Sequence, residues 1–314
     1  MEVITVGPGL AARSFPGDGR PVLLVHGLSS NARLWDLVAR HLGGHPVVAV
    51  DLRGHGLSAQ VPDVEPDATL AAAHDLASVC DDLGWSAPVV AGQSWGGNVV
   101  LQLAADRPLH GIALVDGGWL QLSDRFATID DAWAVLAPPP FDGLTAEALR
   151  ARLRKAHPGW SDEAVEATVG NLEIHVDGTV SPWLARERHR AIVDSMLAHR
   201  PQELYAQVEC PALLLVAGAG NPAASAAAAA VLVFRPQVAP QLVGNDSQPD
   251  RFVTTDDAYG PDSSPTPAQS QRLASYMVAH SQYSTPMVRR NVLTSLLAAD
   301  PGVTRVSYDT TDAP

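Results

Sequence analysis

The segment that most constrains the fold of this chain is an apolar run that ends in the pattern G-x-S-x-G. Residues 89–91 read Val-Val-Ala, and residues 92–97 read Gly-Gln-Ser-Trp-Gly-Gly. This order predicts a buried strand, a sharp turn centred on Ser94, and a helix that begins at once. Such a turn leaves no space for side chains at Gly92 and Gly96, and it exposes the serine hydroxyl. The pattern therefore favours Ser94 as a nucleophile.

Two further motifs precede this turn. An apolar run at residues 22–25 leads into His-Gly-Leu at 26–28, and another at 47–50 leads into Asp-Leu-Arg-Gly-His-Gly-Leu-Ser at 51–58. With the serine turn, in this order and at these spacings, these motifs resemble the α/β-hydrolase fold superfamily. The resemblance is specific over the first 120 residues or so, and it implies a serine hydrolase with a helical cap.

The resemblance also implies which main-chain groups stabilise a reacting oxyanion. These are the backbone N–H groups of Leu28 and Trp95, with His26 and Gly27 shaping the loop that carries Leu28. The positions suit the role, because Leu28 follows a glycine at a strand end and Trp95 begins a helix, whose N-terminal dipole favours negative charge.

Along the chain, short apolar runs alternate with helical spacing, which predicts a mostly parallel central sheet covered on both faces. The expected strands are residues 3–6, 11–15, 22–25, 47–50, 89–91, 111–115, 212–216 and 303–308. The expected helices that cover this sheet are residues 30–42, 68–83 and 97–105. The fold class is therefore α/β, with the sheet of the α/β-hydrolase type.

Helix-forming segments interrupt this alternation after the sixth strand. They lie at residues 146–156, 162–172 and 183–199, and Ser181-Pro182 supplies an N-cap and a first-turn proline for the last of them. This stretch resembles the cap that the superfamily inserts at this point. The domains expected are a core of residues 1–118 and 209–314 and a helical cap of residues 119–208.

Four of the seven tryptophans fall in the predicted cap, namely Trp119, Trp133, Trp160 and Trp183. They suit an apolar acyl-binding surface over Ser94, and equally well a role in holding the cap together. Asp177-Gly178 predicts a tight turn within the cap. Residues 222–285 begin with an alanine run and continue rich in Asp, Ser, Pro, Thr and Gln, which predicts a flexible insertion in the core.

A serine nucleophile needs a histidine to take its proton and a carboxylate to orient that histidine. The resemblance implies an acid after the strand 212–216, where the nearest polar residue is Asn221. Asp116, at the end of the strand 111–115, is the alternative acid, or else it only shapes the loop that leads to the cap. Asp246, Asp250, Asp256 and Asp257 are remote alternatives within the predicted insertion.

The resemblance implies a histidine after the last strand, and none follows residue 308. His280 is the histidine beyond residue 200, in a stretch with helical character, and it is either a relocated base or an ordinary surface residue. Three explanations compete: the chain stops short of its histidine, it uses a relocated base such as His280, or it is a hydrolase-like protein with little activity. The other histidines outside the two loop motifs are interpreted as ordinary surface or cap residues.

The charge and cysteine content of the chain limit the kinds of partner and cofactor that it is expected to bind. The net charge of −13 disfavours nucleic acid and anionic membranes, and the two cysteines lack metal-ligand spacing. No metal cluster or phosphate-binding glycine loop is evident, so no cofactor is implied. The first residues lack the pattern of a secretory leader, and no run is long enough to span a membrane, which favours the cytoplasm.

The expected function is that of a serine hydrolase acting on a small apolar acyl substrate, a carboxylic ester first of all. Serine rather than aspartate at the nucleophile position argues against a haloalkane dehalogenase or an epoxide hydrolase. Cleavage of a C–C bond next to a ketone is one alternative. A ligand-binding protein that keeps Ser94 and lacks a complete triad is the non-enzymatic alternative.

Overall fold

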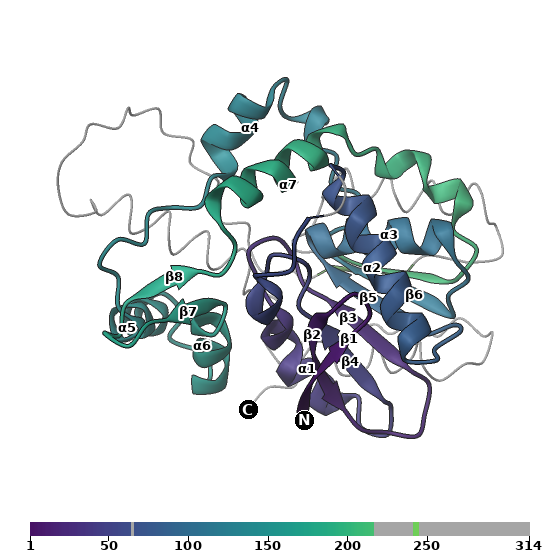
Figure 1. Ribbon diagram of the computed structural model, residues 1–314, viewed down its shortest axis with the longest axis horizontal. Coiled ribbons are helices and arrows are strands. Elements are labelled where there is room, and N and C mark those ends of the chain that lie inside the picture. Colours follow the sequence, from purple (N-terminus) through teal and green to yellow (C-terminus); the bar gives the residue numbers. More distant parts are fainter. Residues whose placement is uncertain (64–65, 217–240, 245–314) are drawn as a thin grey trace.

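The computed structural model of the 314-residue chain describes residues 1–63, 66–216 and 241–244. Within these residues the central sheet has eight strands in the order β1-β2-β4-β3-β5-β6-β9-β10 (Figure 1). The strands are β1 (Glu2–Val6), β2 (Leu10–Phe15), β3 (Val22–Val25), β4 (Val47–Val50), β5 (Val89–Gln93), β6 (Gly111–Val115), β9 (Ala212–Val216) and β10 (Gln241–Gly244). β1 and β2 pair antiparallel, β2 runs antiparallel to β4, and all strands from β4 to β10 across the sheet are parallel. The predicted α/β fold class is confirmed.

The central strands are apolar along their whole length because helices cover both faces of the sheet. Successive side chains of β3 alternate between these faces. Leu23 and Val25 belong to the core that contains α2 (Ala68–Asp82) and α3 (Trp95–Asp106). Val22 and Leu24 belong to the core that contains α1 (Asp36–His41). The continuous apolar runs in the sequence thus correspond to strands buried on both sides.

The helix expected at residues 30–42 is shorter and divided. A 3-10 turn, η1 (Ala32–Trp35), precedes α1. Two side chains set its start: Asn31 accepts a hydrogen bond from the Arg33 N–H at 3.0 Å, and Asp51, beyond β4, accepts one from the Ala32 N–H at 2.6 Å. The helical spacing predicts a helix here correctly, but the Asp51 carboxylate, which follows β4, fixes where the first turn begins.

Between β6 and β9 lies the mostly helical segment for which the sequence predicts a cap, and the segment is called the cap below. Its elements are η3 (Leu122–Asp124), α4 (Ile129–Leu136), α5 (Ala146–Ala156), α6 (Asp162–Val169), β7 (Leu172–Ile174), β8 (Val180–Pro182) and α7 (Arg186–Ala198), followed by η4 (Pro201–Glu203) and η5 (Tyr205–Gln207). Helix α7 lies against α4 and α2, and its residues Ile192, Val193 and Met196 join the main core (Figure 1). The Ser195 hydroxyl also donates to the Asp67 carboxylate, which caps α2. One half of the cap is therefore continuous with the core.

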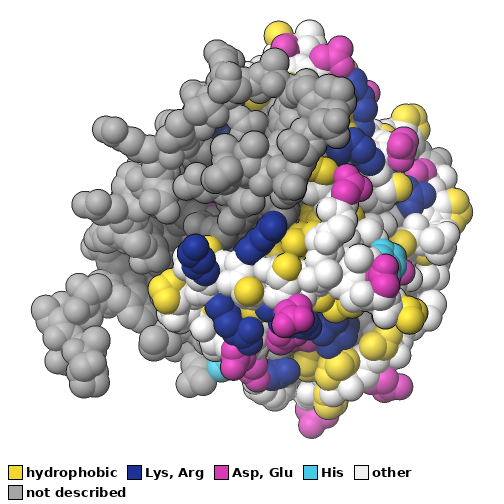
Figure 2. Space-filling model, turned by 90° about the vertical axis from the view of Figure 1, so that its left-hand side faces the viewer, with side chains coloured by type: hydrophobic (Ala, Val, Ile, Leu, Met, Phe, Trp, Pro, Cys, Tyr) yellow, Lys and Arg dark blue, Asp and Glu magenta, His cyan; other side chains and the backbone are white. Residues whose placement is uncertain are grey.

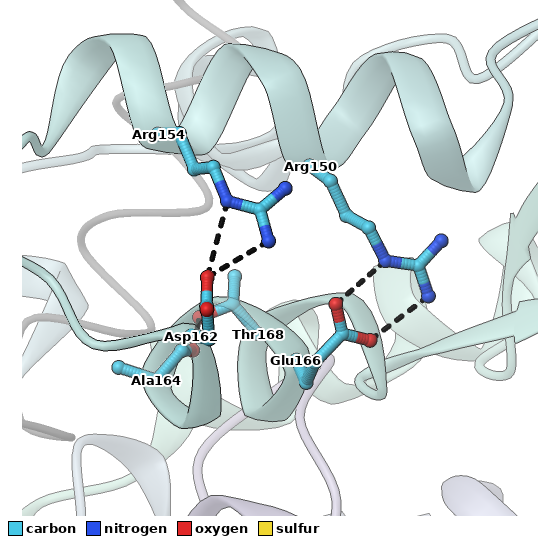
Figure 3. Close-up of polar contacts among 6 residues, drawn as sticks. All are labelled: Arg150, Arg154, Asp162, Ala164, Glu166 and Thr168. Atoms are coloured by element: carbon cyan, nitrogen blue, oxygen red, sulfur yellow. Dashed lines mark hydrogen bonds and ion pairs between the residues drawn. The ribbon is translucent and has the colours of Figure 1, made fainter.

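The other half of the cap, here called the cap lobe (α5, α6, β7 and β8), has a separate apolar core built around Leu149, Leu153 and Val165. Arg150 makes a two-pronged ion pair with Glu166, at 2.6 and 2.9 Å, and Arg154 pairs with Asp162 at 2.8 Å (Figure 3). On the face shown in Figure 2, basic and acidic side chains likewise lie beside one another. Charge pairing on the surface thus accompanies the small core of this lobe.

The hairpin of the cap lobe confirms one prediction and overturns another. Gly178 has φ of +82° in the turn between β7 and β8, as the Asp177-Gly178 pair predicted. Ser181-Pro182 was expected to begin a helix, and this is wrong: Pro182 ends β8, where it pairs with Leu172. Helix α7 begins at Arg186, because β-pairing holds residues 180–182 in an extended conformation.

Strand β10 was not predicted. It pairs in parallel with β9 and lies within residues 222–285, the stretch expected to be an insertion. The rest of that stretch, and the strand expected at 303–308, lie outside the described residues. Among the helices of the described part, none combines the length and the apolar character needed to cross a membrane.

Candidate active site

Three neighbouring parallel strands end at one edge of the sheet, and the candidate residues follow directly from them. His26 follows β3, Ser94 follows β5 and Asp116 follows β6, with β5 paired to both of the other strands. The carboxyl edge of a parallel sheet is where α/β folds bind their ligands. The topology therefore places Ser94 between the loop after β3 and the loop after β6.

Ser94 occupies the turn between β5 and α3 in a conformation that non-glycine residues rarely adopt, with φ of +53° and ψ of −124°. Its N–H donates to the Val115 carbonyl at 2.9 Å, and its carbonyl accepts from the Gly97 N–H at 2.9 Å. Among the described residues its hydroxyl makes no hydrogen bond, and it does not cap α3. Such strain persists only where the surroundings enforce it, and here it leaves the hydroxyl available.

Close main-chain packing enforces this turn. A Cβ on Gly92 would overlap the Gly96 carbonyl oxygen, and one on Gly96 would overlap the His26 carbonyl oxygen. A Cβ on Gly117 would overlap the carbonyl oxygen of Ser94 itself. Glycine is thus required at three positions around Ser94, one of them on the neighbouring loop.

The loop after β3 lies directly against the nucleophile turn. A Cβ built on Gly27 would lie 3.0 Å from the Ser94 Cβ and 2.5 Å from Gln93 Oε1. His26 has a defined role here, since its Nε2 accepts from the Leu52 N–H at 2.9 Å and its Nδ1 lies 2.7 Å from the Gly27 carbonyl oxygen. A carbonyl only accepts, so Nδ1 donates. Both ring nitrogens of His26 thus hold the loop in place.

Leu28 and Trp95, whose N–H groups are the expected oxyanion donors, are both buried. Leu28 belongs to the loop after β3, and Trp95 directly follows Ser94. Trp95 is the first residue of α3, so its N–H lies at the positive end of the helix dipole. Its indole Nε1 donates to the Thr69 hydroxyl at 3.0 Å, and its ring stacks on His55 with centroids 5.8 Å apart. These contacts fix the start of α3.

Asp116 also has an unusual backbone, with φ of +48°, and its N–H donates to the Leu215 carbonyl at 2.7 Å. A buried residue that the sequence analysis missed, Asn98, holds the next part of this loop. Its side chain accepts from the Gly118 N–H at 2.9 Å and donates to the Leu120 carbonyl at 2.8 Å. An asparagine four residues after the serine, within the otherwise apolar stretch 95–101 of the helix, was the signal available.

Two motif histidines are buried in this region, and their rings contact each other at a tilt of 56°. The ring centroids of His26 and His55 lie 4.9 Å apart. Burial lowers the pKa of His55 well below its usual value of 6.5, and the neighbouring His26 adds to the effect. An imidazole with such a pKa, enclosed on all sides, stays neutral and serves packing.

Several candidates lie outside the described residues: the candidate base His280, the asparagine Asn221 at the position expected for the acid, and the remote candidate acids Asp246, Asp250, Asp256 and Asp257. In the part of the chain that is described, no group of three His, Cys, Asp or Glu side chains is placed to hold a metal ion. Two histidines interpreted as ordinary cap residues, His189 and His199, are buried, and His189 contacts the loop after β3.

Comparison with known proteins agrees with this fold. A profile of the Alpha/beta hydrolase family matches residues 22–258. Lipase LipV of Mycobacterium tuberculosis (strain ATCC 25618 / H37Rv) is 32% identical over 178 residues, which cover 56% of this chain and 62% of LipV. A serine hydrolase-like protein of Danio rerio is 29% identical over 178 residues, covering 52% of this chain and 54% of that protein.

Among solved structures, that of E-2-(acetamidomethylene)succinate hydrolase superposes with a TM-score of 0.62 at 22% identity, covering 77% of this chain and 90% of the other. At this identity the likeness concerns the fold. The chain spans between half and two thirds of the length of the two curated relatives. The family profile, by contrast, covers most of the chain, and we conclude that this chain belongs to the alpha/beta hydrolase family.

Proposed function

We propose that this protein is a serine hydrolase that cleaves a carboxylic ester or a related acyl compound through Ser94. The observation that carries the proposal is the strained backbone of Ser94, with φ of +53° and a hydroxyl that makes no hydrogen bond among the described residues. Strain of this kind costs about 1–3 kcal/mol and is typical of functional sites. Nothing in the packing of the turn needs a hydroxyl at this position.

In the proposed reaction the Ser94 oxygen attacks the acyl carbonyl carbon, and the N–H groups of Leu28 and Trp95 donate to the developing oxyanion. The Ser94 proton passes to the base, the ester C–O bond breaks, and the alcohol leaves with that proton while the acyl group stays on Ser94. Water then cleaves the acyl-enzyme, which releases the carboxylic acid and restores the Ser94 hydroxyl. Asp116 is the proposed acid, which orients and stabilises a protonated histidine. Its position supports this role, because Asp116 directly follows β6, the strand that pairs with β5 and so ends beside the Ser94 turn. His280 remains the proposed base.

The proposed substrate is small and apolar in its acyl part. The chain carries an excess of acidic groups, with a net charge of −13, which disfavours polyanionic substrates. The cap begins directly after the Asp116 loop, and it contributes aromatic side chains, Trp119 and Trp133, to the main core and its margin. Apolar and aromatic side chains of this kind line most small-molecule sites.

The test compares wild type with Ser94→Ala on p-nitrophenyl esters of short and medium acyl length. Loss of the nucleophile is expected to lower kcat by about 10⁴-fold or more. Ser78→Ala is the matched control, because Ser78 is an exposed serine on α2 whose hydroxyl only contacts the His74 carbonyl. Equal hydrolysis by wild type and Ser94→Ala rejects the nucleophile, and binding of ester without turnover favours the ligand-binding alternative.

A further inference from the structure

The loop that carries the proposed oxyanion donor Leu28 is held by the cap as well as by the core. Three consecutive residues of this loop, here called the oxyanion loop (residues 27–31), form side-chain hydrogen bonds to two different parts of the cap. These are Ser29 Oγ with His189 Nδ1 at 2.9 Å, Ser30 Oγ with Asn171 Oδ1 at 3.1 Å, and Asn31 Nδ2 with the Gly170 carbonyl at 2.7 Å. The partners lie about 140 to 160 residues away in sequence.

Ser29 is the residue of this loop whose backbone most needs support. Its φ is +59°, in the left-handed region, and it directly follows Leu28. A non-glycine residue in this conformation is held there by its surroundings. The Ser29 side chain reaches the cap through one hydrogen bond, to the imidazole of His189. A change of the Ser29 backbone would turn the peptide group that joins Leu28 to Ser29, and the Leu28 residue would shift with it, its N–H included.

His189 is well suited to hold Ser29, because its ring is buried and immobile. The side chain is 2% exposed and projects from α7. Trp133 of α4 packs edge-on against it, with ring centroids 5.5 Å apart and planes at 78°. The guanidinium groups of Arg186 and Arg190 lie over the same indole, 5.1 and 5.5 Å from its centroid. Helices α4 and α7 together fix the imidazole.

We propose that His189 is a positioning residue, which acts from the cap through Ser29 to hold the Leu28 N–H in the geometry that oxyanion stabilisation requires. The inference rests on the proposed function, and it deepens it. The cap then sets the rate of the chemical step as well as covering the substrate. A displacement of about 1 Å in such a group costs up to about 10²-fold in rate, which fixes the scale of the effect.

The first test measures kcat and KM separately in Ser29→Ala, His189→Leu and His189→Asn. The first two variants are expected to lower kcat about 10- to 100-fold and to leave KM within about twofold, since only the transition state uses the oxyanion donor. His189→Asn is expected to recover most of kcat, because an asparagine amide takes nearly the place of Nδ1. A role in packing alone predicts no such recovery.

The matched control is His175→Leu. His175 is an exposed histidine of the same cap, in the β7–β8 hairpin, and it contacts Ser181 rather than the oxyanion loop. The His175→Leu variant is expected to have the same kcat and KM as wild type. Wild-type kcat in Ser29→Ala, or a raised KM with unchanged kcat in the His189 variants, would overturn the proposal and make His189 part of the substrate surface.

A second measurement separates this proposal from the proposed function. Hydrogen–deuterium exchange of the peptide that contains the oxyanion loop needs no turnover. Exchange is expected to be at least tenfold faster in His189→Leu and Ser29→Ala than in wild type and His175→Leu. If wild type hydrolyses no ester yet exchange follows this order, the proposed function fails and the coupling stands. Equal exchange in all four proteins overturns the coupling.

Discussion

The nucleophile turn (residues 92–97) and the oxyanion loop lie side by side at one edge of the sheet, and they are held in different ways. The nucleophile turn is fixed by main-chain hydrogen bonds and by glycine contacts within the core, such as those of Gly92 and Gly96. The oxyanion loop makes hydrogen bonds to the cap through its own side chains, those of Ser29, Ser30 and Asn31. Contacts within the core therefore hold Ser94, whereas the loop that carries Leu28 is held by the core and the cap together.

The two regions are therefore expected to affect the proposed reaction in different ways. Steric packing of main chain is rigid and has no alternative arrangement, so it suits an atom that must stay in place. Side-chain hydrogen bonds across an interface change when the interface changes. Substitutions near Ser94 are therefore expected to act independently of the cap, and double-mutant cycles with His189→Leu measure that independence directly.

The largest expected effect follows from Asp116→Asn. Asparagine tolerates a positive φ, so the loop is expected to keep its shape while the carboxylate charge is lost. If Asp116 is the acid of the triad, kcat falls about 10³- to 10⁴-fold, because a neutral partner no longer stabilises a protonated histidine. Ester hydrolysis across a pH range checks this result, and an unchanged pH–rate profile would make Asp116 structural.

The next largest effect is expected for Gly117→Ala. The added methyl group would overlap the Ser94 carbonyl oxygen, and the turn has no free space into which to move. The expected cost is about 3 kcal/mol in the free energy of unfolding, within the range known for overpacking. Urea denaturation measures it, with Gly43→Ala as the control, since a Cβ there meets no atom within 4 Å and neither glycine has a positive φ. Equal losses in both variants would show that contact with Ser94 is not responsible.

A smaller effect is expected from pH through His55, whose ring stacks on Trp95 of the nucleophile turn and contacts His26, the residue directly before the oxyanion loop. Burial keeps the folded-state pKa of His55 well below 6.5, so below that pH the unfolded chain binds a proton that the folded chain does not. As the pH falls below 6.5, this one group therefore lowers the free energy of unfolding by up to about 1.4 kcal/mol per pH unit. Urea denaturation between pH 7 and 5 is expected to show a shallower slope in His55→Gln, and identical slopes would contradict this account.

The smallest effect lies in the cap lobe, away from both regions. A hydrogen bond from Arg150 lowers the pKa of Glu166, so the pair adds stability above the usual value of 4.5 and loses it as the pH falls through the lowered value. The pair is largely exposed, so Glu166→Gln is expected to cost only about 0.5 kcal/mol at neutral pH. Thermal unfolding at pH 7 and pH 3 measures the stability cost of Glu166→Gln and shows whether this cost disappears in acid. Glu173→Gln is the control. A cost that persists at pH 3 would point to packing.

Much of the sheet could be predicted because strand burial is a local signal. The strands at 22–25, 47–50, 111–115 and 212–216 were predicted with the bounds that the structure gives them. These runs are apolar on both faces, so no other element competes for them. Pro182 was misassigned because a proline after a serine begins a helix only if the chain is free to turn there. Pairing with Leu172 removes that freedom.

The candidate site could be predicted only where neighbouring residues in sequence define it. Ser94 and the glycines around it form one short motif, and the backbone angles follow from that motif. The contact between Ser29 and His189 joins residues 160 positions apart, and neither residue has a local pattern that indicates the other. Asn98 illustrates the intermediate case, since its place on α3 was predictable but its partners on the Asp116 loop were not.

The most direct test of the central claim, that Ser94 is a reactive nucleophile, is covalent labelling of the folded chain with a fluorophosphonate, followed by peptide mass spectrometry. The account predicts a single phosphonylated peptide, modified at Ser94, that is absent from Ser94→Ala and present in Ser78→Ala. Absence of any adduct from a folded protein, or an adduct on another serine that persists in Ser94→Ala, would contradict the claim.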